Sequence, residues 1–108
     1  MILSSNSNLS IFHDAKIGKI DFDYINKSVY LNLTLDNLSN KGKALLTGLK
    51  TSFIQFQSSE PWGPGIYISK VDLEEKQGNQ EITILLNSGD TFQIIAEYFE
   101  LKLNVPYI

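Results

Sequence analysis

A histidine followed directly by a carboxylate is the first pair in the chain whose side chains could transfer protons or bind a metal. His13 is the only histidine, it precedes Asp14, and Asp21 and Asp23 follow at short spacing. An imidazole beside carboxylates can act as acid and base near neutral pH or help to bind a divalent cation. However, Asp21 and Asp23 alternate with apolar residues, as solvated strand positions do, and Asp14 suits a turn. We therefore predict no catalytic residue, no metal and no cofactor.

The segment SSEPWGPG, residues 58–65, holds the only tryptophan of the chain, Trp62. Its two prolines have a fixed φ and lack the amide hydrogen that a strand ladder needs, so a stiff loop is expected. Trp62 either caps the core, which the usual burial of large aromatic side chains favours, or is an exposed contact residue. Glu60 and Tyr67 lie beside it in the sequence. Together the three residues are candidates for binding a partner or ligand.

Charge gives a second set of candidates. The densest acidic group is Asp72, Glu74 and Glu75, next to a predicted turn. The nine basic residues are all lysines and the formal net charge is -3. Arginine is the best side chain for bidentate contacts to phosphate and guanine, so its absence argues against nucleic-acid binding. An acidic surface instead favours a basic protein partner, such as a toxin domain.

Length and composition limit the architecture. A chain of 108 residues fits one domain with one core, and the absence of cysteine excludes disulfides and thiolate chemistry. Because neither a secretion signal nor a long apolar run is recognisable, we expect a cytoplasmic protein without a membrane partner. We also expect residues 1–7 to be flexible and residues 8–108 to form a single β domain that is a monomer or a weak homodimer.

Alternation of apolar and polar residues predicts an all-β fold. In the clearest strand, Val29, Leu31, Leu33 and Leu35 share one face. An opening strand is expected over residues 9–13. Residues 43–50 fit either a short helix or a strand, and Gly48 and the short length favour the strand. The whole pattern predicts an antiparallel meander of about seven to nine strands, forming a small sandwich or a partly closed barrel.

Local signals refine this prediction. Asn87-Ser88-Gly89-Asp90 is the strongest hairpin turn, because Gly89 accepts a positive φ at little cost. The alternation slips by one residue at 17–20, at 68–71 and near Tyr98. Such slips indicate β-bulges, or bends where a strand passes from one layer to another.

These observations favour a non-enzymatic binding protein, most concretely a small bacterial immunity or antitoxin-like protein that neutralises a protein partner by surface complementarity. Two alternatives remain. A curled sheet or a cleft under the Trp62 loop could hold a carbohydrate or an apolar molecule, or the chain could be a structural subunit of a larger assembly.

Overall fold

The computed structural model describes residues 1–36 and 41–104. Residues 37–40 and 105–108 lie outside this range. The described chain contains one short 3-10 helix and eight strands. These elements are η1 (Leu9–Phe12), β1 (Lys16–Asp23), β2 (Ser28–Asp36), β3 (Lys41–Leu49), β4 (Phe53–Phe56), β5 (Ile68–Lys76), β6 (Asn79–Leu86), β7 (Thr91–Ala96) and β8 (Tyr98–Leu103).

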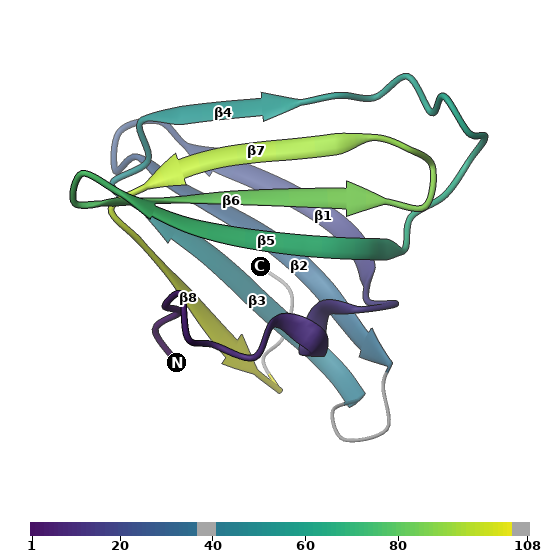
Figure 1. The fold of residues 1–108 in the computed structure, drawn as a ribbon, viewed down its shortest axis with the longest axis horizontal. Coiled ribbons are helices and arrows are strands. Elements are labelled where there is room, and N and C mark those ends of the chain that lie inside the picture. Colours follow the sequence, from purple (N-terminus) through teal and green to yellow (C-terminus); the bar gives the residue numbers. More distant parts are fainter. Residues whose placement is uncertain (37–40, 105–108) are drawn as a thin grey trace.

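The strands form two four-stranded antiparallel sheets, in the orders β1-β2-β3-β8 and β4-β7-β6-β5. Figure 1 shows the second sheet in front, with the strands of the first running obliquely behind it. Hairpins join β1 to β2 and β5 to β6 to β7, and β2 pairs antiparallel with β3. The links β3–β4 and β7–β8 change sheet. The predicted all-β fold is confirmed, and of the two predicted architectures the structure has the sandwich. The preference for a strand over residues 43–50 is also confirmed, because residues 43–49 belong to β3.

The slips in the alternation mark real irregularities. The register shifts between Ile17 and Ile20 in β1, and between Ile68 and Lys70 in β5. The third slip lies where the chain changes sheet: Ala96 ends β7, and Tyr98 begins β8 with Phe99 buried. The opposite phase of β8 is therefore the consequence of a strand entering the other layer.

One side of the sandwich is closed by main-chain hydrogen bonds between its two edge strands. The nitrogen of Ile17 donates to the oxygen of Ile66 (2.8 Å), and that of Ile68 donates to the oxygen of Ala15 (2.8 Å). This short seam joins the start of β1 to the start of β5. It brings the segment around His13 next to Tyr67, although the two are far apart in the sequence.

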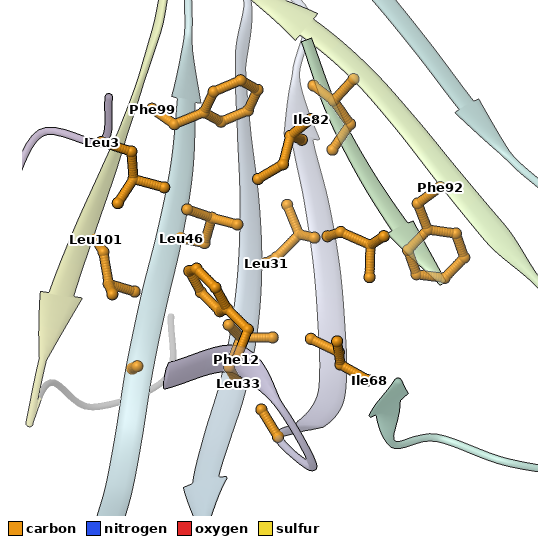
Figure 2. Packing of buried hydrophobic residues seen from close by; sticks show 14 of the residues in the cluster. Leu3, Phe12, Leu31, Leu33, Leu46, Ile68, Ile82, Phe92, Phe99 and Leu101 are labelled. Atoms are coloured by element: carbon orange, nitrogen blue, oxygen red, sulfur yellow. The ribbon is translucent and has the colours of Figure 1, made fainter. Parts of the chain in front are cut away.

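The core lies between the sheets and extends under the N-terminal segment. Figure 2 shows Phe12 against Leu31 and Leu46, and Leu3 beside Phe99. The beginning of residues 1–7, the segment that the sequence predicts to be flexible, contacts this core and β8. Leu3 is only 2% exposed, its nitrogen donates to the oxygen of Phe99 (2.9 Å), and an isolated bridge pairs Ile2 with Glu100. Burial of one leucine and pairing along β8 hold the segment in place.

The expected opening strand at residues 9–13 is wrong, because η1 occupies this position. The side chain of Asn8 accepts a hydrogen bond from the nitrogen of Ser10 (3.1 Å) and caps the helix. This local bond competes with strand pairing, as is usual for Asn. The turn directs Phe12 into the core. Among the described residues, no helix has both the length and the apolar character needed to span a membrane.

Candidate functional site

The loop that contains Trp62 connects opposite edges of one sheet. It leaves β4 at one edge and must reach β5 at the other, so it passes the ends of β7 and β6 and the turn at residues 87–90 that joins them (Figure 1). Four strands with a spacing of about 4.8 Å require the loop to cross roughly 14 Å. The turn at residues 87–90, correctly predicted from its sequence, therefore lies where it can hold the loop.

Asp90 anchors the loop to this turn. Its Oδ1 atom accepts hydrogen bonds from the main-chain nitrogens of Ser59 (2.9 Å) and Glu60 (2.8 Å). The hydroxyl of Ser88 donates to its Oδ2 atom (3.1 Å). Asp90 and Ser88 are both buried. Hydrogen bonds to a carboxylate are stronger than those between neutral groups, so the start of the loop is firmly fixed.

The same turn supports Trp62. The nitrogen of Trp62 donates to the oxygen of Ser88 (2.9 Å), and that of Gly63 donates to the oxygen of Glu60 (2.9 Å). The indole lies directly on Gly89: a Cβ atom there would be 2.7 Å from Cδ2 of Trp62. Trp62 nevertheless remains 69% exposed. The interpretation as a core cap is therefore wrong, and Trp62 is a surface residue on a supported loop.

Glu60 takes a conformation that non-glycine residues rarely adopt. Its φ is 50°, in the left-handed region, where a side chain raises the backbone energy. The hydrogen bond from its nitrogen to Asp90 and the bond that its oxygen accepts from Gly63 hold it there. Its side chain is exposed, and Glu60 precedes Trp62 by two residues in the loop. The loop thus presents a carboxylate and an indole on a main chain that is hydrogen-bonded on both sides.

Tyr67 lies on the other side of the turn. Its nitrogen donates to Oδ1 of Asn87 (3.2 Å), and its oxygen accepts from the nitrogen of Asn87 (2.9 Å). Gly65 packs so closely that a Cβ atom there would come within 2.7 Å of Cγ of Asn87. Tyr67 is 41% exposed, and the ammonium of Lys16 lies 5.9 Å from the centre of its ring. The turn therefore contacts both the segment with Trp62 and the segment with Tyr67.

Next to Tyr67 is a cleft of about 400 Å³, which we call the acidic cleft. Its lining residues come from four separate parts of the chain: His13, Asp14, Asp36, Tyr67, Ile68, Ser69 and Asn87. Nε2 of His13 lies 3.6 Å from Oδ2 of Asp14, and its Nδ1 lies 3.1 Å from the oxygen of Ser69. A smaller cleft of about 290 Å³ lies on the other side of His13. The acidic cleft thus combines two carboxylates, an imidazole and a phenol.

Sequence reasoning identified only part of this group. His13 and Asp14 were considered with Asp21 and Asp23, but those two contact Lys19 (3.6 Å) and Asn26 (2.7 Å) instead. The hydrogen bonds from Asn26 lower the pKa of Asp23. Within residues 1–36 and 41–104, no three acidic or histidine side chains are grouped closely enough to bind a metal ion. No local pattern groups Asp36 with the other residues of the cleft. Asp36 lies at the end of β2, and the start of β5 comes near it because the seam joins β5 to β1.

The acidic candidates Asp72, Glu74 and Glu75 lie elsewhere, along β5 and away from Trp62. At about 3.3 Å per residue, Glu75 is roughly 26 Å from Tyr67. Lys70 pairs with Asp72 (3.5 Å), and Lys76 pairs with Glu74 (3.1 Å) and Glu81 (3.2 Å). The hydrogen bonds with Glu74 and Glu81 raise the pKa of Lys76.

Glu75 has a different environment from its two acidic neighbours. It accepts a hydrogen bond from Nε2 of Gln80 (3.4 Å), whereas Glu74 is opposite Glu81. Successive side chains of a strand point to opposite faces, so Glu74 and Glu75 belong to different faces of the sheet. Lysines compensate the charge of Asp72 and Glu74. The three residues therefore do not form a continuous acidic surface with Glu60, Trp62 and Tyr67.

A second exposed aromatic group was not singled out from the sequence. Tyr24, at the tip of the β1–β2 hairpin, is 71% exposed, and its ring packs edge-on against Phe22 with 6.2 Å between centroids. The ammonium of Lys27 lies 3.1 Å from the centre of the Tyr24 ring. This tip is at the opposite end of β1 from the seam. Tyr24 is therefore a suitable control for Trp62, because both are exposed aromatic residues.

Comparison with known proteins supports the fold. No protein-family model matches the chain. No curated protein matches it significantly. A crystal structure of an uncharacterized protein from Neisseria gonorrhoeae is similar, with a TM-score of 0.64 and 19% sequence identity, over 85% of this chain and 93% of that chain. At this identity, the similarity shows a shared fold and nothing about function.

Proposed function

We propose that this chain is a non-enzymatic binding protein that blocks a basic protein partner, in the manner of immunity and antitoxin proteins. The proposed binding surface, which we call the Trp62 face, consists of Glu60, Trp62, Ile66, Tyr67 and the acidic cleft. The single observation that carries the proposal is the exposure of Trp62 on a loop that Asp90 and Ser88 hold in place. Tryptophan is among the residues most enriched at the energetic centres of protein interfaces.

The rigidity of the loop that contains Trp62 supports a role in binding. Two main-chain nitrogens of the loop donate to a buried carboxylate, and Trp62 lies against Gly89 without being covered by other side chains. A contact residue that is already ordered loses little conformational entropy when it binds. An indole held in this way is therefore suited to fill a pocket of a partner.

The negative charge near Trp62 and Tyr67 also supports a role in binding. The acidic cleft carries Asp14 and Asp36 beside the ring of Tyr67, and Glu60 adds a carboxylate near Trp62. A lysine or arginine side chain of a partner could contact the carboxylates and pack its charged group over the aromatic ring. The net charge of -3 would also attract a basic partner at long range. Both effects favour a positively charged surface as the complement.

The test is binding of a protein partner from the native host by the intact chain and by paired variants. Asp14→Asn with Asp36→Asn should weaken binding and reduce its dependence on salt, because contacts between charges are screened by ions. Asp72→Asn with Glu74→Gln is the matched control, since these carboxylates already pair with lysines. An equal loss of affinity for the partner in both double variants would contradict the assignment of the acidic cleft to the binding surface.

The acidic cleft also supports a second candidate function, the binding of a small carbohydrate. Its volume of about 400 Å³ is within the range of small-molecule sites, and its lining combines carboxylates and an amide with one aromatic ring. Hydroxyl groups of a sugar could bond to Asp14, Asp36 and Asn87 while its apolar face packs on Tyr67. This function can be tested by titrating the protein with sugars and measuring the NMR chemical-shift changes of the cleft residues. A lack of saturable shifts at these residues would reject it.

A further inference from the structure

The four edge strands of the sandwich differ in how they are protected from pairing with other chains. β1 and β5 each contain a register shift and several charged residues, and the seam joins their first residues. β8 is covered at its edge: the nitrogen of Leu101 donates to the oxygen of Met1 (2.8 Å), and that of Leu3 donates to the oxygen of Phe99 (2.9 Å). Bulges, charges and covering segments are the usual means of preventing edge-to-edge association.

β4 lacks these forms of protection. The segment from Thr51 to Ser59 contains no charged residue and no proline. β4 pairs only with β7 among the described strands, in an unbroken register, and Figure 1 shows it along the outer margin of its sheet. Phe53 and Phe56 are each more than 40% exposed. An uncharged, regular edge strand with exposed aromatic residues can form hydrogen bonds with a strand of another chain.

The hydrogen-bond pattern shows which main-chain groups of β4 face outward. The nitrogen of Leu86 donates to the oxygen of Asp90 (2.9 Å), so the even-numbered residues of β7 bond to β6. Its odd-numbered residues therefore bond to β4, and the nitrogen of Gln57 accordingly donates to the oxygen of Thr91 (3.1 Å). It follows that the main-chain groups of Ile54 and Phe56 point away from β7, toward the free edge.

We propose that β4 pairs with β4 of a second copy of this chain, antiparallel about a twofold axis that passes through Gln55. Ile54 of each copy then exchanges hydrogen bonds with Phe56 of the other, and the two apolar side chains pack on the same face. The two front sheets join into one sheet of eight strands. The Trp62 face is not part of this contact, so the dimer goes beyond the proposed function.

Self-complementarity supports a second copy as the occupant. The strand is neutral, so like charges do not face each other in the pairing. The charged residues nearest to β4 along the chain, Lys50 before it and Glu60 after it, lie outside the strand and are opposite in sign. Only four residues per strand pair. The contact is therefore at the low end of interface sizes, and the dimer should be weak and dependent on concentration.

Single-cysteine variants test this register, because the chain has no cysteine of its own. In the proposed pairing, the two copies of residue 55 form a pair without hydrogen bonds, with Cα atoms about 4.5 Å apart, within the range of a disulfide. Gln93 is the matched control, because it is the partner of Gln55 on β7. Its two copies would be separated by three strand spacings, roughly 14 Å.

On oxidation, Gln55→Cys should form a covalent dimer roughly tenfold faster than Gln93→Cys, since only residue 55 has its copy within reach. Gln55→Lys should also abolish the dependence of the sedimentation coefficient on concentration, because two ammonium groups would face each other. Equal rates of cross-linking for the two cysteine variants would overturn the proposal. A wild-type chain that sediments as a monomer at all concentrations would overturn it as well.

Discussion

The carboxylate of Asp90 accepts a hydrogen bond of 2.8 Å from the main-chain nitrogen of Glu60, 30 residues earlier in the chain. This contact joins the Pro- and Gly-rich loop to the turn between β6 and β7. It places Trp62 on Gly89 on one side of the turn, while Asn87 binds Tyr67 on the other. The geometry of the Trp62 face thus depends on four consecutive residues, 87–90.

Replacement of the anchor should loosen the loop. Asp90→Ala leaves the nitrogens of Ser59 and Glu60 without their acceptor, which should lower the free energy of unfolding by about 1–3 kcal/mol. The fluorescence anisotropy of Trp62 should fall as the loop becomes mobile. Denaturation in urea and the anisotropy measure both effects. Asp72→Ala, at an exposed position of β5, is the control, and similar results for the two variants would refute the anchoring role of Asp90.

A second pair of variants isolates the contact between Gly89 and Trp62. Gly89 and Gly78 both have a positive φ, of 87° and 82°, but nothing lies within 4 Å of a Cβ atom at Gly78. Alanine at either position should cost about 1 kcal/mol in backbone strain. Only Gly89→Ala should lose further stability and shift the emission of Trp62, because the new methyl group displaces the indole. Unchanged emission of Gly89→Ala would contradict the described packing.

The N-terminal segment gives a third prediction. Leu3→Ala should lower the free energy of unfolding by about 2–5 kcal/mol, as expected for a buried leucine. Ile2→Ala should have little effect, because Ile2 is more than half exposed. Chemical denaturation of both variants measures the difference. If both substitutions were equally mild, the segment would be flexible, as its polar sequence had indicated.

The ion pairs of Lys76 predict a dependence on pH. Its pKa is raised above 10.5 because the ammonium donates to Glu74 and also to Glu81. The resulting stabilisation should be fully present below pH 10.5 and be lost as the pH rises through the higher pKa of the folded protein. The stability difference between the wild-type chain and Lys76→Met should therefore shrink at alkaline pH. A difference that stays constant would show that these pairs do not contribute.

Much of the fold could be predicted from local patterns in the sequence. The alternation in β2, the turn at Gly89 and the slips in β1 and β5 follow from side-chain period and backbone freedom, which are properties of short segments. The same limit explains why η1 was missed and why the burial of Leu3 was not predicted. A polar segment looks flexible until the groove that receives Leu3 and Phe12 is known, and that groove is formed by strands far along the chain.

The candidate site was only partly predictable. The composition of the loop identified Glu60 and Trp62, because prolines and glycines act locally on the backbone. The exposure of Trp62 depends on Asp90 and Gly89, which no local pattern connects to it. Asp36 reaches the acidic cleft because β1 and β5 meet at the seam. Pairing between distant edges therefore determines which charged residues share a surface.

The most direct test of the proposed function is the capture of a stoichiometric protein partner from the native host by three immobilised chains. These are the wild-type chain, Trp62→Ala and Tyr24→Ala, in which the two aromatic residues have nearly equal exposure, 69% and 71%. We predict that the wild-type chain and Tyr24→Ala retain the same partner and that Trp62→Ala loses it. Retention of the partner by Trp62→Ala, or the absence of any stoichiometric partner on the wild-type chain, would contradict the proposed function.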